Sequence, residues 1–120
     1  MITSIPTTQQ HKAKLEQAAP CVLIVDDEPL NRAVLEHLLS HNGFDTIQGT
    51  NGREAIAFAT DPTINIDLIL LDISMPDITG IQVLRLIRQI RSQMELPIIM
   101  VTSMDDNAQL VEAFLSLIHI

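Results

Sequence analysis

Three continuous apolar runs, each stopped by a residue with a side-chain oxygen, constrain the fold of this chain more than any other feature. They are residues 21–25 before Asp26, residues 67–71 before Asp72, where the apolar part is 68–71, and residues 97–101 before Thr102. Unbroken apolar runs of this length are typical of strands buried on both faces, whereas half-exposed strands alternate apolar and polar residues. The runs therefore predict the central strands of a sheet covered on both sides.

Segments with helical spacing lie between these runs. Helices are predicted to begin near Pro29, Asn51, Gly80 and Asp105, and residues 44–49 alternate as a half-exposed strand would. Proline suits a first helical turn, because its missing N–H has no helical partner there. The third helix is expected to turn Ile81, Leu84, Ile87 and Met94 inward and Arg85, Arg88 and Arg91 outward.

The order of these elements is strand then helix, four times over. This alternation predicts an α/β fold with a doubly wound parallel sheet, because right-handed crossovers place helices on both faces. Ligands of such folds bind at the carboxyl ends of the strands. The residues that stop the apolar runs are therefore the candidates for chemistry.

These residues form a set of oxygen ligands. Asp26 and Asp27 follow the first run, Asp72 follows the second, and Thr102 follows the last. Three carboxylates at one edge repel one another, and a hard cation such as Mg²⁺ relieves that repulsion. A carboxylate beside Mg²⁺ can attack phosphorus, and a threonine hydroxyl can donate to a phosphoryl oxygen. Taken singly, each Asp is equally consistent with a helix cap or a turn.

Composition excludes several classes of protein. The formal net charge of −8 leaves no basic face for direct nucleic-acid binding. No segment approaches the ~18 apolar residues of a membrane span, and the N-terminus lacks the apolar core of a signal peptide. The single cysteine, Cys21, lies in an apolar run and is expected to be a core residue. These features indicate a cytoplasmic protein.

Four segments together resemble the receiver domain of bacterial two-component response regulators. They are residues 23–32 (LIVDDEPLNR), 51–55 (NGREA), 67–80 (DLILLDISMPDITG) and 97–103 (PIIMVTS). The resemblance covers residues 21–114 and implies a flavodoxin-like fold with strand order 2-1-3-4-5. It also implies a signalling module of a phosphorelay rather than a conventional enzyme.

The resemblance gives roles to individual residues. Asp72 resembles the phosphorylated aspartate, and Thr102 resembles the switch hydroxyl. Asp27 resembles a direct Mg²⁺ ligand, Asp26 supports the ion directly or through water, and the Ser74 backbone carbonyl resembles a further ligand. The implied phosphoryl donor is a phosphohistidine on a sensor histidine kinase or a histidine phosphotransfer protein. An output domain, fused or separate, is also implied.

The sequence departs from the family at its C-terminal end. Family members have a fifth strand ending in lysine and a fifth helix, whereas residues 21–120 contain no lysine and end before either element. Residues 1–19 are expected to be a linker or flexible segment. Residues 115–120 (LSLIHI) match one frame of a transposon-end adapter used in DNA library preparation, and we expect a non-native tail; natural truncation is the alternative.

Two other functions are kept as alternatives. A pseudo-receiver, or a fragment that does not switch, would only bind partners and would not need phosphorylation. A phosphatase of the haloacid dehalogenase type also uses an Asp after a strand, but that family has a second Asp two residues later. Ser74 occupies that position here.

Overall fold

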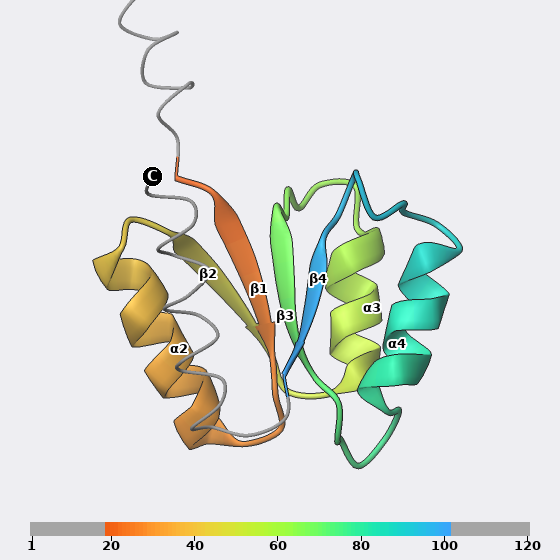
Figure 1. The fold of residues 1–120 in the computed structure, drawn as a ribbon, viewed down its shortest axis with the longest axis horizontal. Helices are drawn as coiled ribbons and strands as arrows, with labels where there is room; N and C mark the ends of the chain where they lie inside the picture. Colours follow the sequence, from red (N-terminus) through yellow and green to blue (C-terminus); the bar gives the residue numbers. More distant parts are fainter. Residues whose placement is uncertain (1–18, 102–120) are drawn as a thin grey trace, which may run out of the picture.

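A four-stranded parallel sheet forms the centre of residues 19–101, the part of the chain that this computed structural model describes (Figure 1). Its strands are β1 (Cys21–Val25), β2 (Asp45–Gly49), β3 (Leu68–Asp72) and β4 (Ile98–Val101), in the order β2-β1-β3-β4. This order confirms the predicted doubly wound fold through its fourth strand. Thr102, the predicted fourth helix and the segment 115–120 lie outside the described residues.

Helices cover both faces of the sheet. Helix α2 (Pro29–His41) lies on one face, and α3 (Gly52–Thr60) and α4 (Gly80–Arg88) lie on the other (Figure 1). Alternate residues of β1 point to opposite faces of the sheet. Val22 and Ile24 belong to the hydrophobic cluster under α2, and Leu23 and Val25 belong to the hydrophobic cluster under α3 and α4. Burial on both faces explains why the central strands are continuously apolar.

Local signals set the ends of the helices. Pro29 is the first residue of α2, and Gly43 just beyond the helix has a φ of +85°, which glycine adopts without a Cβ penalty. The Asn51 side chain caps α3 by accepting the Glu54 N–H at 2.9 Å. Helix α4 begins with a reciprocal capping box between Thr79 and Gln82. The predicted starts near Pro29 and Asn51 are therefore confirmed.

The predicted inward face of the third helix was partly wrong. Helix α4 ends at Arg88, so Met94 falls in the following turn and is 96% exposed. Ile81 is 46% exposed, whereas Val83 and Ile87 are fully buried. Gln82, Arg85 and Arg88 share one side of this helix and Ile81 lies among them, whereas Val83 and Ile87 lie on the opposite, apolar side. Arg88 is also not simply outward, because its guanidinium donates to the Leu96 carbonyl at 2.7 Å.

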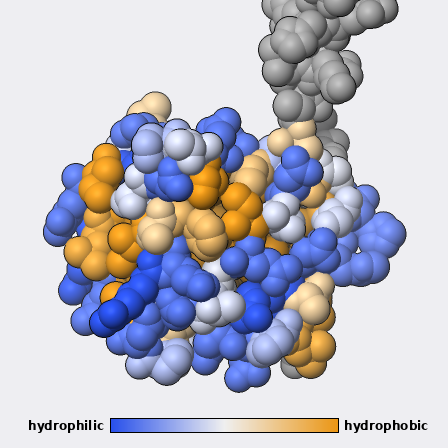
Figure 2. Space-filling model, turned by 180° about the vertical axis from the view of Figure 1, so that it is seen from behind, coloured by the Kyte–Doolittle hydropathy of each residue, from blue (hydrophilic) through white to orange (hydrophobic). Residues whose placement is uncertain are grey.

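Apolar side chains also reach the surface, and Figure 2 shows them between hydrophilic residues on one face of the molecule. The largest exposed ones are Leu30, Ile81, Leu86, Ile90 and Met94. Within residues 19–101, no helix has the length and apolar character that a membrane crossing needs.

Candidate functional site

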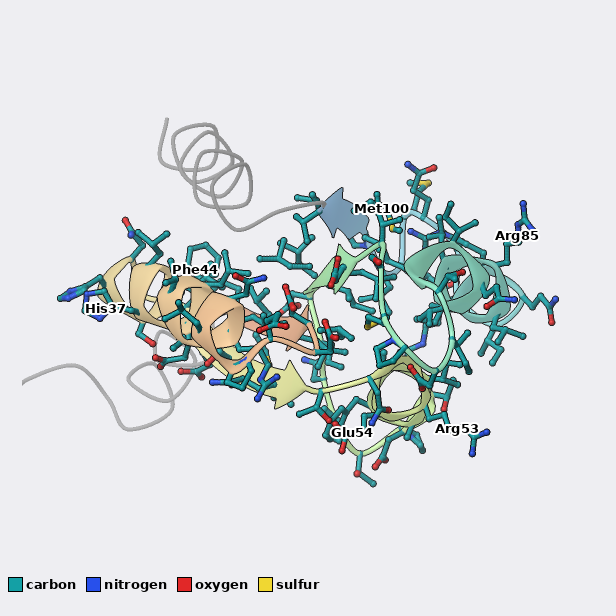
Figure 3. The ribbon with its side chains drawn as sticks, turned by 90° about the horizontal axis from the view of Figure 1, so that it is seen from below. His37, Phe44, Arg53, Glu54, Arg85 and Met100 are labelled. Atoms are coloured by element: carbon teal, nitrogen blue, oxygen red, sulfur yellow. The ribbon has the colours of Figure 1, made fainter. Side chains whose placement is uncertain are left out.

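Three carboxylates converge at the carboxyl edge of the sheet. The parallel register pairs Val25 of β1 with Leu71 of β3, so the residues that follow each, Asp26 and Asp72, emerge side by side. Asp26, Asp27 and Asp72 each place one carboxylate oxygen within 4.8 Å of the others. Figure 3 looks onto this edge, between α2 on one side and α3 and α4 on the other. The structure therefore brings together the three acids that the sequence singled out.

Asp26 is held rigidly by its neighbours. It is only 1% exposed, and its Oδ1 accepts the Glu28 N–H at 2.9 Å. The Asn31 side-chain amide donates to Oδ2 at 3.0 Å, and the Arg32 guanidinium donates to the Asp26 backbone carbonyl at 2.7 Å. These donors compensate a carboxylate that would otherwise be costly to bury. Sequence analysis did not predict the roles of Asn31 and Arg32, although both belong to the quoted motif at residues 23–32.

Asp72 is the last residue of β3 and is 7% exposed. Its Oδ1 accepts the Ser74 N–H at 3.1 Å. Burial raises the pKa of Asp72 to about 6, and the nearby Asp26 and Asp27 carboxylates add to this rise while the Ser74 hydrogen bond opposes it. Burial, with a smaller contribution from the neighbouring carboxylates, therefore disfavours the charged form of Asp72. A perturbed carboxyl in such a cluster is typical of a functional site.

The loop after Asp72 is fixed at both ends. The Ile73 N–H donates to the Val101 carbonyl at 3.0 Å, which continues the pairing of β3 with β4 beyond the strand end. The Gly80 N–H donates to the Ile73 carbonyl at 2.9 Å, which closes the loop at the start of α4. Ser74 lies between these points and is exposed. Its N–H contacts Asp72, and its predicted role as a carbonyl ligand stays a prediction.

The cluster has the chemistry of a site for a hard divalent cation. Its three carboxylates each offer an oxygen within reach of one ion. A bound cation would offset the repulsion between these negative charges. Asp27 is the most exposed of the three acids, which leaves the cluster open to solvent on its side. A separate hollow of about 480 Å³ lies over the β3–α4 loop and α4, lined by Asp77, Ile78, Gln82, Arg85 and Leu86.

The doubly wound sheet and the acids at its carboxyl edge define a flavodoxin-like α/β domain with an acidic site. More specifically, the chain belongs to the response regulator receiver domain family, whose model matches residues 22–117. This membership confirms the resemblance drawn from the sequence motifs. It identifies the domain as a module of two-component signalling.

Known proteins with similar sequences combine this domain with different activities. The transcriptional regulatory protein ResD of Bacillus subtilis is 41% identical over 93 residues, which are 78% of this chain and 37% of ResD. A protein-glutamate methylesterase/protein-glutamine glutaminase of Trichodesmium erythraeum is 40% identical over 79 residues, which are 66% of this chain and 22% of that protein. The chain thus spans well under half the length of these two relatives.

A solved structure shares the fold. The response regulator TrrA of Thermotoga maritima, in complex with Mg(2+)-BeF, superposes with a TM-score of 0.62 at 36% identity. The match covers 69% of this chain and 69% of that one.

Proposed function

We propose that the domain accepts a phosphoryl group on Asp72 from a phosphohistidine of a sensor histidine kinase or a histidine phosphotransfer protein. The observation that carries this proposal is the convergence of Asp26, Asp27 and Asp72 at the carboxyl edge of the sheet, with Asp72 as the perturbed member. Family membership supports it. We further propose that the domain acts in the cytoplasm and controls an output domain, fused or separate.

In the proposed reaction, one carboxylate oxygen of Asp72 attacks phosphorus. An O–P bond forms, the N–P bond of phosphohistidine breaks, and the leaving imidazole nitrogen keeps the bonding electrons and takes a proton from water. Ser74 N–H holds Oδ1 of Asp72, which leaves Oδ2 as the proposed nucleophile. Attack requires the ionised carboxylate, and the raised pKa of Asp72 means that this form is lost as pH falls through about 6.

A Mg²⁺ ion suits this site. Asp27, Asp72 and the Ser74 backbone carbonyl are the proposed ligands, with Asp26 supporting the ion directly or through water. When bound, Mg²⁺ would offset the negative charge of the acids and of the phosphoryl oxygens. The buried Asp26 carboxylate, oriented by hydrogen bonds from Glu28 and Asn31, would help to fix the positions of the ligands. Thr102, outside the described residues, is the proposed hydroxyl that responds to the phosphoryl group.

Phosphorylation of the chain by acetyl phosphate tests this proposal. The chain is incubated with Mg²⁺ and acetyl phosphate, and the intact mass is measured. We expect a gain of one phosphoryl group that disappears with EDTA and in Asp72→Asn. Asp67→Asn is the control, because Asp67 is exposed at the opposite end of β3 and should not affect labelling. Equal labelling of Asp72→Asn and the unmodified chain would overturn the assignment.

A second candidate is a receiver that binds partners without phosphorylation. The observation that favours it is that residues 21–120 contain no lysine, so this segment offers no ammonium group to pair with the phosphoryl oxygens. A chain that binds Mg²⁺ but gains no mass from acetyl phosphate would support this alternative over the first proposal.

A further inference from the structure

We propose that Asp77 is a positioning residue of the site, which ties the loop carrying Ser74 to the first turn of α3 and so holds the Ser74 backbone in place for the cation. The inference rests on the proposed Mg²⁺ site. Asp77 itself lies outside the acidic cluster, and sequence analysis gave it no role.

The hydrogen bonds of Asp77 link two distant segments. Its Oδ1 accepts the Gly52 N–H at 3.1 Å, and its Oδ2 accepts the Arg53 N–H at 3.2 Å. Figure 3 shows the Arg53 side chain projecting away from the sheet, so Arg53 engages Asp77 through its backbone. Both carboxylate oxygens of this exposed side chain are thus used to join the β3–α4 loop to a helix that precedes it in the chain.

The contact completes the N-terminus of α3. A helix leaves its first four N–H groups without helical partners. The Asn51 side chain accepts one of them, the Glu54 N–H, and the Ala55 N–H makes the first regular helical bond, to the Asn51 carbonyl. Asp77 accepts two more, the Gly52 and Arg53 N–H groups, and a carboxylate there is favoured by the helix dipole. The N–H of Ile78, followed by that of Gly52, holds the pKa of Asp77 below its usual range, so Asp77 stays ionised at neutral pH.

Packing makes the link rigid. A Cβ added to Gly52 would lie 3.0 Å from Ile78 Cβ and 3.1 Å from the Ile78 carbonyl, so the loop and the helix start are already in close contact. Ser74 is three residues before Asp77, between the fixed strand end at Asp72 and this link. Without the Asp77 carboxylate, the middle of the loop would lose its tie to α3. Groups that orient a metal ligand typically affect metal affinity about 10–100-fold.

Two alanine variants separate positioning of the loop from capping of the helix. Asp77→Ala removes two acceptors from the N-terminus of α3 and frees the loop, whereas Asn51→Ala removes the side-chain acceptor of the same helix turn and leaves the loop attached. The Mg²⁺ dissociation constant is measured by calorimetry on the full chain. We expect it to rise about 10-fold in Asp77→Ala and to change less than about 2-fold in Asn51→Ala. Asp77→Asn keeps one acceptor oxygen and should lie between them.

Amide hydrogen exchange in EDTA supplies a second readout that needs no metal. The amides of residues 73–79 should exchange faster in Asp77→Ala than in Asn51→Ala. Unchanged exchange of these amides, or equal losses of Mg²⁺ affinity in the two alanine variants, would overturn the role of Asp77. Failure of the unmodified chain to bind Mg²⁺ would instead overturn the proposed metal site, whatever the exchange data show for the loop.

Discussion

Gly80 lies directly against the backbone carbonyl of Asp72. A Cβ at position 80 would overlap that carbonyl oxygen and would lie 2.8 Å from the Cα of Ile73. Helix α4 therefore begins in contact with the end of the strand that carries the proposed acceptor. The loop between them has no room to shift at this point, because backbone rather than a flexible side chain fills the space.

Gly80→Ala should therefore lower the free energy of unfolding by about 2–3 kcal/mol, the upper part of the range for forcing extra atoms into a packed site. Gly43→Ala is the matched control: its φ of +85° penalises a side chain, but nothing lies within 4 Å of the added Cβ. We expect that control to cost only about 1 kcal/mol. Urea unfolding followed by circular dichroism measures both. Equal losses would show that backbone conformation, not contact with Asp72, fixes glycine at position 80.

Cys21 should react slowly with iodoacetamide at mildly alkaline pH. Burial raises the pKa of its thiol, and the Asp67 and Asp45 carboxylates add to this effect by disfavouring the thiolate. The rate should be several-fold below that of the same chain unfolded in urea. Asp67→Asn should speed the reaction, because it removes a charge while an amide oxygen can still accept the Cys21 N–H. A folded chain that reacts as fast as the unfolded one would contradict this prediction.

Sequence analysis located most elements because their signals are local. Pro29 and Asn51 mark helix starts by their own chemistry, and the apolar runs of β1 and β3 identify central strands because both faces of those strands are buried. The run at residues 97–101 forms β4, which lies at the end of the described sheet and is half-buried over residues 98–100. The convergence of Asp26 with Asp72 was also predictable, since parallel strands deliver their ends to one edge. The buried side of α4 was missed although the sequence indicates it, because Ile81 lies between Arg85 and Arg88 on the polar side of the helix, whereas Val83 lies beside Ile87 on the apolar side.

Apart from this convergence of strand ends, hydrogen bonds between distant segments could not be predicted from the sequence. Asp77 lies 25 residues after Gly52, and no local pattern marks a carboxylate that will cap a helix elsewhere in the fold. The support of Asp26 by Asn31 is closer in sequence, at a separation of five residues. A helix that begins at Pro29 brings Asn31 back toward the strand end, so this contact could have been inferred from the position of Asn31 in the first turn.

Asn31→Ala should weaken both the fold and the metal site. It leaves one oxygen of a buried carboxylate without its donor, which typically costs about 1–3 kcal/mol. It also leaves the Glu28 N–H as the one described donor that orients the Asp26 carboxylate, so the Mg²⁺ dissociation constant should rise several-fold. Unfolding in urea and calorimetric titration with Mg²⁺ measure the two effects.

Asn42→Ala is the control for Asn31→Ala. The Asn42 side-chain amide donates to the Leu38 carbonyl at 2.8 Å, but it does so in an exposed position at the far end of α2. Its loss should cost less than about 1 kcal/mol and leave Mg²⁺ affinity unchanged. If both variants lost Mg²⁺ affinity equally, the amide of Asn31 would have no specific role in orienting Asp26.

The charge of Asp72 should make the metal-free protein less stable as pH rises. The folded-state pKa is about 6, above the value of ~3.9 expected for the unfolded chain, so the folded state binds more protons between these values. Stability is therefore highest, with respect to this group, below pH ~4 and declines as pH rises through about 6. The full shift corresponds to about 3 kcal/mol, and solvent access on the Asp27 side should reduce the observed decline to about 1–2 kcal/mol.

Asp72→Asn should abolish this decline, so that in EDTA at pH 7 the variant is more stable than the unmodified chain by about 1–2 kcal/mol. With Mg²⁺ present, the unmodified chain should be the more stable of the two. Mg²⁺ stabilises only a chain that binds it, and Asp72→Asn removes a proposed ligand. Asp27→Asn should stabilise the metal-free protein less, since Asp27 is the most exposed acid of the cluster. Urea unfolding at pH 4 to 8, with EDTA or with Mg²⁺, measures all three chains. A metal-free Asp72→Asn that is less stable than the unmodified chain at pH 7 would contradict the unfavourable burial of the Asp72 charge beside Asp26 and Asp27.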